Sequence, residues 1–114
     1  MKRSVSSNQR QVRMISLIAN AAGTALTGLD SSNPHISMTD TGTGVKTIEL
    51  GASGFASADY SVIVTTATAD SVPQISITDA NTFVVSTFDS TDGTTAKDAI
   101  CHILVIGSDV TDRR

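Results

Sequence analysis

The chain has 114 residues, the size of one domain with a single modest core. Hydrophobic residues make up 39% of it but aromatic residues only 4%, so a core must rest mainly on Ile, Val and Leu, which favours sheets. No stretch approaches the roughly 20 apolar residues that a membrane-spanning helix needs, so we expect no membrane partner. The net charge of −3 is unevenly distributed: residues 1–29 carry four bases and no acid, whereas residues 30–112 carry eleven acids and two bases.

The first segment, residues 1–11, is almost entirely polar. Such a composition cannot bury enough apolar surface to fold by itself, so we predict an extended basic arm. Lys2, Arg3 and Arg10 lie in this arm, and Arg13 follows it closely. We expect these four cations to contact an acidic surface of a partner protein. Nucleic acid is a poorer partner, because the arm has no aromatic residue for stacking and the rest of the chain is acidic.

From residue 12 onward, apolar runs alternate with turn signals rich in Gly, Pro, Asp and Asn. Short strands about a dozen residues apart are typical of a β-sandwich or barrel. We predict strands at residues 12–20, 24–29, 35–39, 45–50, 60–68, 74–78, 82–88 and 99–107, with a turn at Asp70–Pro73 among those between them. Residues 12–114 are therefore predicted to form one all-β domain, an antiparallel β-sandwich for which a jelly-roll-like strand order is one form.

Side-chain alternation supports these strands. Tyr60, Val62 and Val64 fall on one face of their strand, and Ile75 and Ile77 alternate with polar residues in theirs.

The last strand is different, because both of its faces are apolar. One face holds Ile100, Leu104 and Ile106, and the other holds Cys101, Ile103 and Val105. This pattern predicts a strand buried on both sides, either in the centre of the fold or at a subunit contact.

Candidates for catalysis are few. Cys101 and His102 are neighbours in a predicted strand, so their side chains point to opposite faces and make a poor nucleophile–base pair. Neither His35 nor His102 belongs to a metal-binding spacing pattern. We therefore predict a protein that is not an enzyme, with no cofactor or metal site and with an inert, buried thiol at Cys101. Calcium at the acidic loop 89–93, or a glycan at the loops, stays open.

Part of the chain resembles a known class of proteins. The residues that carry this resemblance are Gly54-Phe55, Asp59–Val64, Val72-Pro73, Thr82–Phe88, Asp92-Gly93 and Ile103–Gly107. In order and type they are similar to small β-sandwich proteins and fibre modules of tailed-bacteriophage virions.

The resemblance implies a structural virion protein. Its first form is a capsid decoration, or cement, protein: a homotrimer on the capsid surface that binds the major capsid protein and stabilises the lattice, with its N-terminal arm reaching across shell subunits. The alternative form is a tail-fibre or receptor-binding, lectin-like module, in which the arm attaches to the tail and the loops contact the host. The sequence leaves capsid and tail locations, the host and the copy number open.

Overall fold

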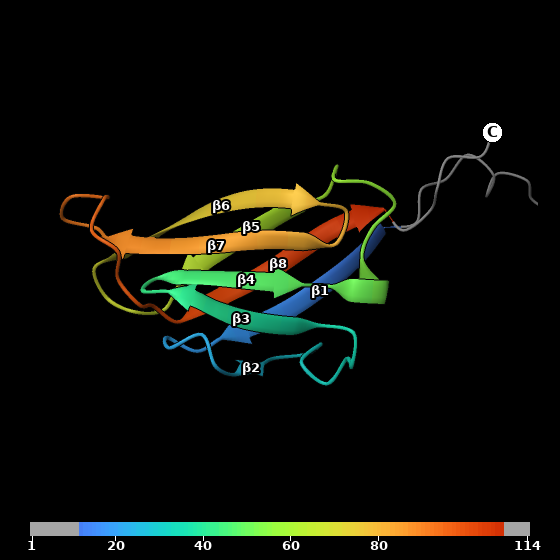
Figure 1. Cartoon of the computed structure of the whole chain (residues 1–114), viewed down its shortest axis with the longest axis horizontal. Coiled ribbons are helices and arrows are strands. Elements are labelled where there is room, and N and C mark those ends of the chain that lie inside the picture. Colours follow the sequence, from blue (N-terminus) through green and yellow to red (C-terminus); the bar gives the residue numbers. More distant parts are fainter. Residues whose placement is uncertain (1–11, 109–114) are drawn as a thin grey trace, which may run out of the picture.

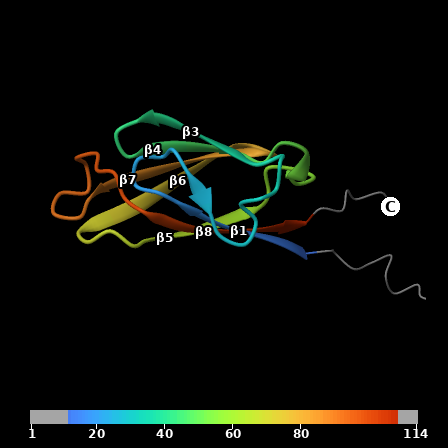
Figure 2. The same cartoon turned by 90° about the horizontal axis from the view of Figure 1, so that it is seen from below.

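Two antiparallel β-sheets lie face to face in residues 12–108, the part of the chain that the computed structural model describes (Figures 1 and 2). All eight described strands correspond to a predicted strand, which confirms the all-β fold. The strands are β1 (Val12–Ala19), β2 (Leu26–Thr27), β3 (Ser37–Gly42), β4 (Val45–Glu49), β5 (Ser61–Thr66), β6 (Ser71–Asp79), β7 (Thr82–Asp89) and β8 (Cys101–Ser108). The predicted arm, residues 1–11, lies outside the described residues.

Each sheet has four strands. Sheet A has the order β2-β1-β8-β5 and sheet B the order β3-β4-β7-β6. The chain changes sheet four times, after β2, β4, β5 and β7. Sheet B contains two hairpins of consecutive strands, β3-β4 and β6-β7, and both are antiparallel. The jelly-roll-like order stays a prediction.

The turn predicted at Asp70–Pro73 is wrong for its last three residues. Strand β6 begins at Ser71 and includes Pro73, which pairs with Thr87 of β7. Proline fits here because β6 is the edge strand of sheet B, where one side of the backbone needs no partner. The turn itself is made by Asp70, whose φ of 58° is in the left-handed region.

The core lies between the sheets and follows the predicted alternation. On sheet A, buried side chains include Ile15, Leu17 and Ile103, and on sheet B they include Ile48 and Val85. Each of these residues is at most 3% exposed, while its neighbours along the strand are more exposed. Because alternate residues of a strand point to opposite sides of its sheet, each sheet has one buried face.

Three of the four aromatic residues gather at one end of this core. The rings of Phe55 and Tyr60 stack with centroids 5.0 Å apart, and Tyr60 meets the edge of Phe83 at 6.3 Å. The Tyr60 hydroxyl faces the carbonyl oxygens of Asp79 and Thr82, at 3.0 and 3.1 Å. Tyr60, which directly precedes β5 of sheet A, is therefore hydrogen-bonded to the β6-β7 turn of sheet B.

The opposite end of the core is closed by polar groups. Lys46 is only 1% exposed, and its Nζ donates to the carbonyl of Ala99 at 3.1 Å. Thr87 is equally buried and bonds to the backbone of Gly44 and Lys97. Gly44 has a φ of +70°, and a Cβ there would lie 2.5 Å from the Thr87 oxygen, so this contact requires glycine.

Tyr60 makes the stability of the fold depend on pH at the alkaline end. Burial, with a smaller contribution from Asp79, raises the pKa of Tyr60 from 10.0 to about 12. The folded state therefore holds the phenolic proton more tightly than the unfolded state. The resulting stability is complete below pH 10 and falls as the pH rises toward 12, at about 1.4 kcal/mol for each pKa unit.

We expect urea unfolding midpoints measured between pH 9 and 12 to fall for the native sequence more steeply than for Tyr60→Phe. The Phe variant removes the titrating group and keeps the ring, so it serves as the matched control. Parallel curves for the two proteins would contradict this role of Tyr60.

Candidate interaction surface

Of the four predicted contact residues, Arg13 lies within the described structure. Lys2, Arg3 and Arg10 lie outside residues 12–108, so their role stays a prediction. Arg13 lies in β1, where its guanidinium donates to the carbonyl of Gly54 at 2.7 Å and sits 4.6 Å from the centroid of the Phe55 ring. These contacts fasten the start of β1 to the segment that follows the short 3₁₀ turn Gly51–Ser53.

The outer surface of sheet A carries large apolar side chains that the fold leaves in solvent. We call it the sheet A face and define it by the outward side chains of β1, β8 and β5. The pairing register arranges them in three rows: Met14, Ile106 and Ser61; Ser16, Leu104 and Ile63; Ile18, His102 and Thr65.

Large apolar side chains on this face are unusually accessible. Met14 is 62% exposed and Ile63 is 51% exposed, and Val12, at the start of β1, is 68% exposed. Leu104 and Ile106 are half-buried by these neighbours. Contiguous apolar surface of this kind marks interaction sites more often than scattered apolar residues do.

The outer surface of sheet B has a different chemistry. Its central strands carry the polar residues Thr47, Glu49 and Ser86 and the apolar residues Val45, Val84 and Phe88, and the edge strand β6 carries Gln74, Ser76 and Val72. The polar side chains are what a solvated sheet face ordinarily shows, and the apolar side chains beside them are less exposed than Met14 and Ile63 of the sheet A face. Of the two outer faces, the sheet A face is therefore the one suited to contact.

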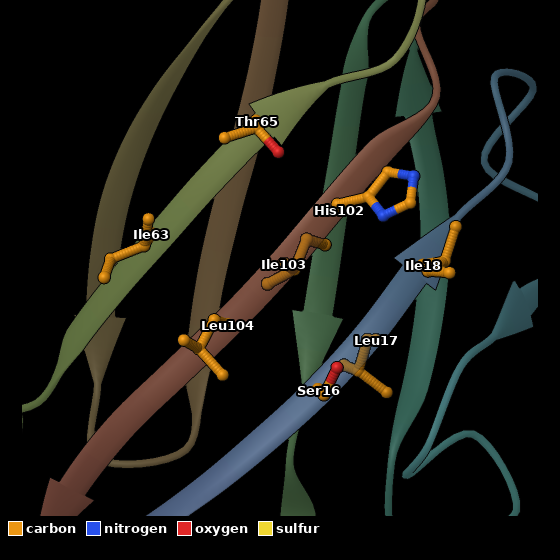
Figure 3. Close-up of a pocket in the computed structure, with 8 residues that line it drawn as sticks. All are labelled: Ser16, Leu17, Ile18, Ile63, Thr65, His102, Ile103 and Leu104. Atoms are coloured by element: carbon orange, nitrogen blue, oxygen red, sulfur yellow. The ribbon is translucent and has the colours of Figure 1, made fainter.

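A shallow hollow lies in the sheet A face, with a volume of about 260 Å³ (Figure 3). Its rim is formed by β1, β8 and β5, and the His102 ring lies over β8 on the side of Ile18. The lining residues are Ser16, Leu17, Ile18, Ile63, Thr65, His102, Ile103 and Leu104. The hollow is mostly aliphatic, so it fits an apolar side chain better than a charged ligand.

Charge separates this face from the rest of the body. Residues 12–108 contain three Lys or Arg and nine Asp or Glu, a net of −6. None of these twelve residues is among those that define the sheet A face. The face is an uncharged area on an acidic body.

The loops at the far end of the sandwich are tied together. Gly44 N donates to the Asp98 carboxylate at 2.6 Å, and Lys97 Nζ donates to the carbonyls of Ala69 and Asp70 at 2.9 and 3.2 Å. These bonds join the β3-β4, β5-β6 and β7-β8 connections into one rigid end.

In the acidic loop 89–93, a possible calcium site by sequence, Asp89 and Asp92 form hydrogen bonds in and beside the loop. Asp89 accepts hydrogen bonds from the backbone and hydroxyl of Thr91, and Asp92 accepts from Thr94 and Thr95. These bonds lower the pKa of both carboxyls, that of Asp92 to about 2. Within residues 12–108, no group of three or more His, Cys, Asp or Glu side chains is arranged to hold a metal ion.

Cys101 and His102 lie on opposite faces of β8, as predicted. Cys101 is completely buried, and burial raises the pKa of its thiol, while His102 is exposed on the sheet A face. The prediction that both faces of the last strand are buried is wrong for its outer side within one chain, because Leu104 and Ile106 are half-buried and Ile100 is 37% exposed.

Sequence reasoning found the apolar outer side of β8 but missed its neighbours. Ile63 stands alone between Ser61 and Thr65, and Met14 lies far away in the chain. Only the pairing of β1 and β5 with β8 brings these residues onto one surface.

Comparison with protein-family models, with curated proteins and with solved structures found no match to this chain. Among the described residues there is no helix with the length and apolar composition needed to cross a membrane.

The burial of Cys101 predicts a thiol that does not react in the folded protein. Ellman's reagent should label it at the rate of global or local unfolding, and at least a hundredfold faster in concentrated guanidinium chloride. Fast, stoichiometric labelling of the folded chain would show that the thiol is accessible. A Ser61→Cys variant, whose thiol lies on the exposed sheet A face, is the positive control.

Proposed function

We propose that this chain is a structural protein of a bacteriophage particle, a decoration or cement protein that binds the capsid surface as a homotrimer and stabilises the lattice. The observation that carries the proposal is an uncharged, apolar sheet face on an acidic β-sandwich. Such a face gains free energy when another protein covers it, at about 25 cal/mol for each Å² of apolar area removed from water. The resemblance of residues 54–107 to virion β-sandwich proteins supplies the biological setting.

The position of the chain ends supports a division of labour. β1 begins and β8 ends at the same end of the sandwich, where Val12 pairs with Ser108 (Figures 1 and 2). The basic segment 1–11 therefore joins the body at the end of sheet A, away from the tied loops. In the proposed function, Lys2, Arg3 and Arg10 bind an acidic surface of the major capsid protein, and three copies in one trimer strengthen weak single contacts by raising the effective concentration.

The rigid loop end favours one second candidate, a tail-fibre or receptor-binding module. Five acidic residues, Asp40, Asp70, Asp89, Asp92 and Asp98, lie in or beside these loops. In that role the basic segment attaches to the tail, and the opposite, loop-bearing end faces the host. Loops that are fixed by hydrogen bonds present polar groups to a glycan with little ordering cost.

Electron microscopy of purified virions, labelled with gold-coupled antibody against this chain, tests both candidates. Label distributed over the capsid supports the decoration role, and label confined to the tail supports the fibre role. Particles that lack the chain, by label and by mass spectrometry of their proteins, would overturn both.

Removal of residues 1–11 should abolish attachment without unfolding the sandwich, because the core and both sheets lie within residues 12–108. Purified truncated protein, mixed with particles grown without the chain, should cosediment at least tenfold less than the full chain. Circular dichroism and the thermal midpoint check that the truncated chain is folded.

The matched control is the charge variant Lys2→Gln/Arg3→Gln/Arg10→Gln, which keeps the length of the segment. Loss of attachment in both variants assigns the effect to the cations. Undiminished cosedimentation of the truncated chain would contradict the role of the arm.

A further inference from the structure

We infer that the sheet A face is the contact between copies of this chain, with three copies arranged around an axis that runs along β8. The inference rests on the proposed function for the number of copies, and it adds which surface joins them. Three observations support this inference: the charge of the body, the pattern of side chains on the face, and the width of sheet A.

The charge of the body favours a second copy at this face. Each described body has a net charge of −6, so two copies repel one another over most of their surfaces. The residues that define the sheet A face include no Asp, Glu, Lys or Arg. One carboxylate, that of Asp30, lies beside the face at the edge of β1, where it accepts a hydrogen bond from the Ser16 backbone N–H at 2.7 Å. A cationic partner, by contrast, would bind the Asp and Glu side chains, none of which is among the residues that define the sheet A face.

The shape of the face is complementary to itself. A symmetry axis along β8 keeps all copies at the same level, so β1 of one copy meets β5 of the next copy row by row. In the first row Met14 then faces Ser61, and in the second row Ser16 faces Ile63. The third row sets Ile18 against Thr65. Every row thus pairs a large aliphatic side chain with a smaller hydroxyl side chain, which lets the two surfaces interdigitate.

The central strand supplies the layers next to the axis. Ile106, Leu104 and His102 of β8 each lie between a β1 residue and a β5 residue of their row. Three copies would therefore stack an isoleucine layer, a leucine layer and a histidine layer along the axis. Leu104 occupies the middle of both the strand and the row pattern, so it is the residue whose change should matter most.

The width of the sheet fits a three-fold arrangement. Packed sheets lie about 10 Å apart, so each sheet sits about 5 Å from the axis, and the triangle that they enclose has a side of about 17 Å. Strands are about 4.8 Å apart, so three to four strands fill that side. Sheet A has four strands, of which β2 has only two residues.

Interchain disulfide formation in the full chain tests this geometry. In the double variant Met14→Cys/Ser61→Cys, the two cysteines of one chain are two strands apart, about 10 Å, which is too far for an internal disulfide. Across the inferred contact they face each other. Mild oxidation should convert most of the protein into covalent dimers and trimers on a non-reducing gel, and reduction should reverse this.

The control places a pair of cysteines in one row on the outer side of sheet B, three strands apart. Thr39→Cys/Ser76→Cys puts cysteines on the outer edge strands β3 and β6, in one row through Thr47 and Val84. This variant should remain monomeric on the gel. Equal cross-linking of the two double variants, or none in the sheet A variant, overturns the inference.

Sedimentation equilibrium gives the second measurement. The native chain should be a trimer, and Leu104→Asp should be a folded monomer, because it places a carboxylate in each copy next to the axis. Val84→Asp, on the central strand β7 and the outer side of sheet B, is the control that should stay trimeric. A native monomer or dimer, or a trimer that survives Leu104→Asp, overturns the inference.

A native monomer or dimer would also contradict the homotrimer of the proposed function, whereas the cross-linking pattern and the Leu104→Asp result test only the inferred surface. Gold label on virions would still support a virion role if the copies prove to be joined elsewhere. Absence of the chain from virions would leave the cross-linking result intact.

Discussion

Strand β8 is the constraint on which the rest of the structure depends. It pairs with β1 on one side and with β5 on the other, so it is interior to sheet A. Its inward side chains, Cys101, Ile103 and Val105, are at most 2% exposed and form one wall of the core. Two of its outward side chains, Leu104 and Ile106, are also aliphatic, and within one chain nothing described covers them fully. The inward face of β8 is covered by sheet B, and its outward face is not. This outward face is the centre of the uncharged surface through which we propose that copies of the chain associate.

The sheet A face and the acidic side chains of the body are made of different residues. Core packing and the Tyr60 hydrogen bonds hold sheets A and B together, and none of the residues that define the sheet A face is acidic. This separation allows copies of an acidic protein to meet without burying unpaired charge, which is costly in a dry interface. It also leaves the acidic loops and the basic segment 1–11 for contacts with other molecules.

Arg13 shows how a cation that looks free in the sequence can belong to the fold. Its guanidinium lies over the Phe55 ring and donates to Gly54, so part of its binding capacity serves the body. The same holds for the carboxylates of Asp89 and Asp92, which look like ligands for an ion in the sequence but cap their own loop. In both cases short-range partners outcompete an external one because they cost no translational entropy.

The sequence by itself determined the number and order of the strands, the residues that alternate into the core, and the burial of Cys101. These properties are local: a period of two and the chemistry of turn residues act over a few neighbouring positions. Only the tertiary structure decided which strands are neighbours, and so it alone joined Met14, Leu104 and Ile63 into one face. It also placed Pro73 within an edge strand and gave Lys46 a buried acceptor at Ala99. Such pairings depend on contacts between residues that are distant in the chain, which no local pattern records.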